Sequence, residues 1–270
     1  MFRPKRRRFK GLNVNTLIPN MMTLLATCAG LTAIRWGLQE KWEIALLAVL
    51  AAAILDALDG RIARLLKGTS KFGAELDSLS DFVAFGVTPA LLLYLWVLQD
   101  AGRFGWMITL LFALACGLRL ARFNVADQEE DPPAWASHFF SGVPAPAAAG
   151  LVLLPMMLAV QTDSDFMRHP VPVTIIMLLV AGLMVSPLPT YSFKKLKIPH
   201  HGVMPLMLVF GVTMAALITA PWVTLTIVLS LYMLSMPFSV RTYLAMKREA
   251  EAHHPPEDTG EDDAPTGVGA

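Results

Sequence analysis

Charged side chains are scarce in this chain. Asp, Glu, Lys and Arg make up 16% of its 270 residues, whereas they make up roughly 25% of an ordinary soluble domain. Hydrophobic residues account for 55% of the chain instead. This balance excludes an ordinary soluble protein and predicts an integral membrane protein in contact with the lipid bilayer. We expect no nucleic-acid partner.

Cysteine is rarer still. The chain has two cysteines, Cys28 and Cys116, and both lie inside long apolar runs. A cysteine in such a run is by default a buried, apolar side chain, so we expect neither a disulfide nor a cysteine metal site. The neighbouring His200 and His201 point in different directions, which favours a place at the membrane interface over metal binding.

Long apolar runs dominate what is present. A spanning helix needs about 20 mostly apolar residues, and eight runs meet this condition: 17–38, 42–66, 74–98, 103–122, 145–162, 170–187, 202–220 and 222–245. Lipid offers backbone groups no hydrogen-bond partner, so such runs must be helical. The sequence therefore predicts an all-α, polytopic membrane helix bundle of about eight transmembrane helices.

The Lys and Arg residues predict the orientation of these helices. With the N-terminus in the cytoplasm, all but four of the 22 basic residues fall on the cytoplasmic side. The exceptions are Arg35, Lys41, Arg103 and Arg168. Cytoplasmic loops carry an excess of Lys and Arg, so we expect both termini to be cytoplasmic.

The two ends of the chain differ in charge. Residues 1–16 form a basic segment, interpreted as a topology signal or as a site of attraction for anionic lipid. Residues 246–270 are acidic and rich in Pro and Gly, a composition typical of disorder. Between them we expect a helical core over 17–190 and an additional pair of helices over 191–245.

Four aspartates interrupt the apolar pattern. Asp56 and Asp59 lie three residues apart on one predicted helix, and Asp77 and Asp81 lie four apart on the next, so each pair shares a helix face. A charge within a span costs about 2.5–3.5 kcal/mol. Bound divalent cations are the simplest compensation, and oxygen ligands without His or Cys favour Mg²⁺ or Mn²⁺.

The residues around the aspartates favour a phosphate ligand. Gly60, Ala63 and Gly73 are small enough to let a ligand approach the backbone, and Arg64 offers a bidentate grip on a phosphate. Two alternatives remain open for the individual residues: salt bridges from the aspartates to Arg61 or Arg64, and glycines that serve close helix packing.

The complete pattern resembles a known signature. Asp56-x-x-Asp59-Gly60-x-x-Ala63-Arg64, then eight residues, then Gly73-x-x-x-Asp77-x-x-x-Asp81, resembles that of the CDP-alcohol phosphatidyltransferase family. The segment "PNMMT", with Asn20 and Thr23, resembles the family's first-helix segment near the donor. The resemblance implies a six-helix membrane core, usually dimeric, a metal site formed by the four aspartates, and Asp81 as general base. It places the CDP-linked donor against Asn20, Thr23, Asp59, Gly60, Ala63, Arg64 and Gly73.

Two further segments bear on the acceptor alcohol. "LRLARFNV", residues 118–125, and "FSGVPAPAAAG", residues 140–150, resemble segments of bacterial integral-membrane members of this family that use serine. This implies CDP-diacylglycerol as donor, L-serine as acceptor, and a bacterial inner membrane with a site facing the cytoplasm. Arg119, Arg122 and Asn124 are the predicted serine-binding residues, because guanidinium groups bind carboxylates strongly. The arginines have a second interpretation, as markers of the cytoplasmic side.

Other functions are weighed against this one. Glycerol 3-phosphate, inositol phosphate or choline would replace serine within the same chemistry. A divalent-cation or proton transporter also places carboxylates inside a membrane, but it predicts polar residues through the outer halves of the spans and an inverted repeat of the motif. The sequence contains neither feature.

Overall fold

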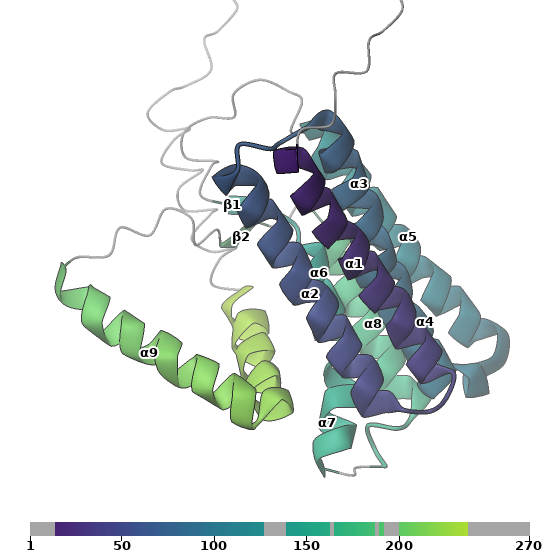
Figure 1. Ribbon diagram of the computed structural model, residues 1–270. Helices are drawn as coiled ribbons and strands as arrows, with labels where there is room; N and C mark the ends of the chain where they lie inside the picture. Colours follow the sequence, from purple (N-terminus) through teal and green to yellow (C-terminus); the bar gives the residue numbers. More distant parts are fainter. Residues whose placement is uncertain (1–13, 127–138, 163–164, 187–188, 192–199, 237–270) are drawn as a thin grey trace, which may run out of the picture.

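The computed structural model describes residues 14–126, 139–162, 165–186, 189–191 and 200–236, and these residues are predominantly helical (Figure 1). The elements in chain order are α1 (Val14–Gly37), α2 (Trp42–Leu65), α3 (Lys71–Asp81), the π-helix η1 (Phe82–Val87), α4 (Thr88–Trp96), the 3₁₀-helix η2 (Leu98–Ala101), α5 (Gly102–Ala126), β1 (Phe139–Ser141), α6 (Ala145–Val152), α7 (Leu154–Thr162), α8 (Pro170–Val185), β2 (Pro189–Tyr191) and α9 (His200–Thr219). A last described helix covers Pro221–Met236. The strands β1 and β2 pair in antiparallel fashion.

Each apolar run in the sequence overlaps a helical stretch, and four of these stretches are long and apolar enough to cross a membrane: Asn15–Gly37, Lys71–Trp96, Leu98–Val125 and Ala145–Thr162. Three shorter apolar helices follow them: Pro170–Val185, Val203–Thr219 and Pro221–Met236. The helix α2 has 24 residues and carries the first aspartate pair. The described residues thus form a helical bundle of the membrane type.

The stretch Lys71–Trp96 is one continuous rod made of α3, η1 and α4. Ser70 begins it as an N-cap, since its hydroxyl accepts from Gly73 N at 3.0 Å. The π-helix η1 precedes Pro89, which has no N–H to offer the carbonyl of Phe85 and whose ring would crowd that carbonyl in an α-helix. The backbone N–H of Thr88 donates to Val83 O, five residues back, and the Thr88 hydroxyl donates to the same carbonyl at 2.9 Å. The wide turn therefore accommodates a proline inside a spanning helix.

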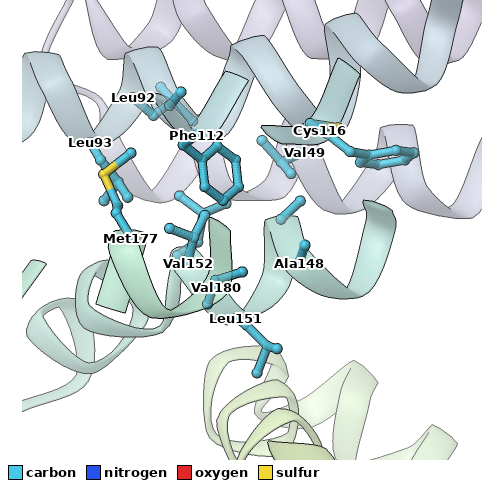
Figure 2. Close-up of a cluster of buried hydrophobic side chains, with 14 of the residues drawn as sticks. Val49, Leu92, Leu93, Phe112, Cys116, Ala148, Leu151, Val152, Met177 and Val180 are labelled. Carbon is cyan, nitrogen blue, oxygen red and sulfur yellow. The ribbon is translucent and has the colours of Figure 1, made fainter. Parts of the chain in front are cut away.

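The apolar core lies where α2, α4, α5, α6 and α8 meet (Figure 2). Its labelled members are Val49, Leu92, Leu93, Phe112, Cys116, Ala148, Leu151, Val152, Met177 and Val180. Cys116 is buried, as predicted, but Cys28 is exposed on α1. The prediction of burial was wrong for Cys28 because an apolar residue of a spanning helix can face outward toward lipid as well as inward.

Small residues bring α1 and α2 together. Ala26 and Ala33 on α1, and Ala45 and Ala52 on α2, are all at most 1% exposed, and the two helices pack side by side. Such small side chains let helix backbones approach closely in membranes. The opposite face of α1 exposes large side chains, among them Leu24 and Leu25, as expected for a surface in contact with lipid.

The last two helices differ in their packing. The helix α9 stands apart from the bundle (Figure 1), and it exposes Met207, Leu208 and Phe210. Pro221–Met236 instead contacts the bundle: Thr226 Oγ1 accepts from Gln161 Nε2 at 3.1 Å, and Leu229 lies against Gly150. Gly150 ends the "VPAPAAAG" segment, which begins α6 and packs closely, as its small residues predict.

Candidate active site

The signature residues surround a cavity between α1, α2 and α3. Its volume is about 180 Å³, and its lining is Pro19, Asn20, Thr23, Asp59, Gly60, Ala63, Arg64, Gly68, Thr69, Ser70, Gly73, Ala74 and Asp77. All seven residues predicted to contact the donor are in this lining. The structure therefore brings together residues from three helices that the sequence separates by more than fifty positions.

Three of the four aspartates form one cluster. Asp56, Asp59 and Asp77 each offer a carboxylate oxygen, and these oxygens lie within 4.8 Å of one another. The helical spacing explains this, because α2 turns Asp56 and Asp59 toward α3. Asp81 completes the group, since its carboxyl lies in hydrogen-bond contact with that of Asp56. Two carboxyl groups this close need a shared proton or a cation between them.

The cluster fits a hard divalent cation. Its ligand atoms are all carboxylate oxygens, which Mg²⁺ and Mn²⁺ prefer. The Oδ1 atom of Asp81 is buried and, within the described part of the chain, has no hydrogen-bond partner. Arg61 and Arg64 form no ion pair with these aspartates among the described residues. The salt-bridge interpretation of the motif thus has no support, and the acidic charge is left for a cation to balance.

The glycines of the signature serve different purposes. A Cβ atom on Gly60 would meet only Arg64 Nη1, at 3.9 Å, so the backbone there faces open space. A Cβ on Gly73 would lie 2.9 Å from Asn20 Oδ1. Gly73 therefore allows close packing of α3 against the Asn20 side chain, whereas Gly60 keeps room at the cavity wall for a ligand.

The start of α1 is tied to the loop between α2 and α3. Asn15 Nδ2 donates to Leu66 O at 3.3 Å, and a Cβ on Gly68 would lie 2.1 Å from Asn15 O. Lys67 takes a positive φ of 50° just before this contact. The contact holds the loop over one end of the cavity, where Thr69 and Ser70 reach the lining.

The predicted serine-binding residues on α5 do not converge on one point. Arg119 is partly buried and interacts electrostatically with Asp81, and its Nε atom has no hydrogen-bond partner among the described residues. Asn124 exchanges hydrogen bonds with Ser78 of α3 at 3.0 and 3.2 Å. Arg122 is exposed and donates to Val185 O, at the end of α8, at 3.3 Å. Arg119 and Asn124 thus face α3, whereas Arg122 faces α8.

Several polar residues of the site were missed by the motif. Ser70 had a signal, because a serine directly before a helical run is a typical N-cap. Thr27 and Ser80 had none: they are hydroxyl residues within helices, and their hydrogen bonds to each other and to Thr23 O depend on how α1 and α3 pack.

Comparison with known proteins agrees with this geometry. The family model described as CDP-alcohol phosphatidyltransferase matches residues 16–186, and that described as CDP-alcohol phosphatidyltransferase 2 matches residues 202–237. The chain belongs to the CDP-alcohol phosphatidyltransferase family.

Individual relatives share one name. A CDP-diacylglycerol–serine O-phosphatidyltransferase of Mycobacterium tuberculosis (strain ATCC 25618 / H37Rv) is 40% identical over 246 residues, which cover 89% of this chain and 82% of that protein. One from Helicobacter pylori (strain J99 / ATCC 700824) is 39% identical over 188 residues, 69% of this chain and 76% of that protein. One from Bacillus subtilis (strain 168) is 36% identical over 151 residues, 54% of this chain and 81% of that protein.

Proposed function

We propose that this protein is an enzyme that transfers the phosphatidyl group of CDP-diacylglycerol to the hydroxyl of L-serine, forming phosphatidylserine and CMP. The observation that carries the proposal is the cavity between α1, α2 and α3, which gathers every residue of the family signature except Asp56 and Asp81, and these two lie beside it. The relatives named for this reaction supply the choice of donor and acceptor.

The four aspartates form the site for the divalent cation, Mg²⁺ or Mn²⁺. When bound, such an ion supplies positive charge that neutralises phosphate oxygens. The carboxylates also repel the anionic donor unless their charge is balanced, so binding of the cation and of the donor are expected to depend on each other.

The side chains divide the remaining work. Arg64 lines the cavity and binds the phosphates of the donor. Arg119, next to Asp81, binds the serine carboxylate. Asp81 takes the proton of the serine hydroxyl as that oxygen forms its bond to the β-phosphorus. The bond from this phosphorus to the CMP oxygen breaks, and CMP leaves with the bonding electrons.

The setting of the reaction is part of the proposal. We infer eight spans with both termini in the cytoplasm and a cytoplasm-facing site in a bacterial inner membrane, in line with the distribution of Lys and Arg. The acyl chains of the donor stay in the bilayer while its polar end enters the cavity. The working unit is taken to be a homodimer.

Release of CMP by the purified protein tests the proposal. The assay contains CDP-diacylglycerol, Mn²⁺ or Mg²⁺, and one alcohol at a time: L-serine, glycerol 3-phosphate, inositol phosphate or choline. We expect release with serine only. Release with another alcohol would support phosphatidyl transfer but reject serine as the acceptor. No release from folded protein with any alcohol would reject the proposal that the protein is such an enzyme.

A further inference from the structure

A buried network of hydroxyl groups stands behind Asp59. Thr23 Oγ1 donates to Asp59 Oδ2 at 2.5 Å, Ser80 Oγ donates to the Thr23 carbonyl at 3.0 Å, and Thr27 Oγ1 donates to Ser80 Oγ at 2.8 Å. Thr23, Asp59 and Ser80 are each at most 4% exposed. The network joins α1, α2 and α3 and ends at the carboxylate of Asp59, a member of the acidic cluster.

These bonds differ from those that hydroxyl groups usually make in apolar helices. Thr32, Thr109 and Thr213 each donate to the carbonyl four residues back, at 2.6–2.8 Å, which is the ordinary way to satisfy a hydroxyl within a helix. Thr23 and Thr27 have the same option, at 3.1 and 3.2 Å. Each nevertheless makes a shorter hydrogen bond to a side chain of a neighbouring helix, Thr23 to Asp59 and Thr27 to Ser80. Both hydroxyl groups therefore point away from their own helix and toward α2 or α3.

The number of protons also matches the number of acceptors. Each hydroxyl has one proton to donate, and the three protons of Thr27, Ser80 and Thr23 serve Ser80 Oγ, Thr23 O and Asp59 Oδ2 in turn. A hydroxyl that donates to one carboxylate oxygen fixes the plane of the group and so the direction of its other oxygen. Hydrogen bonds of this kind to metal-binding side chains typically contribute 10–100-fold to metal affinity or activity.

We infer that Thr23, supported by Ser80 and Thr27, is a positioning residue that orients the Asp59 carboxylate for a divalent cation. The sequence had indicated Thr23 as a contact for the donor, and its hydroxyl proton is instead committed to Asp59. This inference rests on the proposed function only in taking the four aspartates as a cation site.

Binding of Mn²⁺ alone to the full-length protein in detergent tests the inference, for example by electron paramagnetic resonance of the unbound ion. Thr23→Val removes the hydroxyl and keeps the shape of the side chain, and we expect it to weaken Mn²⁺ binding about 10-fold or more. Thr23→Ser restores the hydroxyl and should bind within about twofold of the wild-type protein. Thr32→Val, on the same helix, is the matched control, because it loses only a bond to its own helix.

Mn²⁺ binding by Thr23→Val equal to that of Thr32→Val would overturn the inference, and so would equal losses in Thr23→Val and Thr23→Ser. If Thr23→Val does not fold, Ser80→Ala decides the question: a loss of about 2–5-fold is expected, and unchanged binding would overturn the inference. No substrate is present, so a failure here is distinguishable from a failure to release CMP with serine.

Discussion

At the scale of single residues, Asp81 has two neighbours of opposite charge, the Asp56 carboxyl and the Arg119 guanidinium. Its carboxyl contacts that of Asp56, and it also interacts with the Arg119 guanidinium of α5. A general base needs a carboxylate that can receive a proton during the reaction, and one Asp81 oxygen is buried without a partner among the described residues. That oxygen is the atom expected to take the proton of the acceptor alcohol.

Replacing Asp81 with Asn removes the base and keeps the size of the side chain. We expect CMP release to fall by at least about 100-fold, the lower end of what general base catalysis contributes, while CDP-diacylglycerol still binds. Turnover and donor binding by the same purified variant are the measurements to compare. Asp100→Asn, in η2 and exposed, serves as the control and should retain activity; an active Asp81→Asn protein would contradict the role of base.

The sequence predicted the aspartates better than their partners. Residues three or four apart on a helix share a face whatever surrounds them, so the pairing of Asp56 with Asp59 and of Asp77 with Asp81 follows from spacing. That the two pairs meet depends on the packing of α2 against α3. The hydrogen bond from Thr23 to Asp59, and the turn of Arg122 toward Val185, depend on how neighbouring helices are rotated. The rotation of one helix against another cannot be derived from the spacing of residues in a single sequence.

At the scale of elements, glycines decide how closely segments approach. A Cβ on Gly105, in the first turn of α5, would lie 1.9 Å from Leu98 O in η2, so only glycine fits there. A Cβ on Gly182 of α8 has no atom within 4 Å. The two positions are both helical and both glycine, yet their surroundings predict opposite responses to the same substitution.

Gly105→Ala should therefore destabilise the protein by about 1–3 kcal/mol, the usual cost of overpacking. Gly182→Ala should have no steric cost and should stabilise α8 by about 0.5–1 kcal/mol, since alanine is the better helix former. Thermal unfolding in detergent, followed by tryptophan fluorescence, compares the two variants with the wild-type protein. A Gly105→Ala protein as stable as Gly182→Ala would show that α5 does not approach η2 so closely.

Helix positions were predictable because apolar runs of spanning length leave little choice of structure. The third helix was predicted to begin at residue 74, but it begins at Lys71 because Ser70 caps it. The π-helix η1 was not predicted. Pro89 indicates a disturbance of the helix, but whether the result is a kink, a break or a wide turn depends on the packing of Phe85 and Gly86 in the core.

At the scale of the whole molecule, the described parts of the last two helices differ in how closely they pack on the core. Pro221–Met236 contributes Leu225, Leu229 and Met233 to the edge of the core, and Gln161 of α7 donates to Thr226 of this helix. We had expected both helices after residue 190 to be additions to the core. Of the two, α9 fits that proposal better than Pro221–Met236, which packs on the core.

Two truncations test this difference. A chain ending at residue 245 loses only the acidic segment 246–270 and should keep CMP release within about twofold of the full-length protein. A chain ending at residue 219 also loses the helix packed on Gly150 and the hydrogen bond from Gln161 to Thr226. Close packing and interhelical hydrogen bonds are what hold helices together in a membrane. We expect that chain to aggregate or lose activity, as judged by size-exclusion chromatography and CMP release; a folded, active product would show that the core is complete without its last helix.

The packing of α1 on α2 has a consequence for the making of the protein. Chains enter the membrane from the N-terminus onward, so α2 brings Asp56 and Asp59 toward the bilayer before α3 and α5 have been synthesised. Thr23 is already part of α1 by then, and its bond to Asp59 lies within the first helical hairpin. The pair α1 and α2 thus carries a hydrogen-bond donor for one of its own carboxylates, and Thr23 is synthesised before the Asp59 that it bonds.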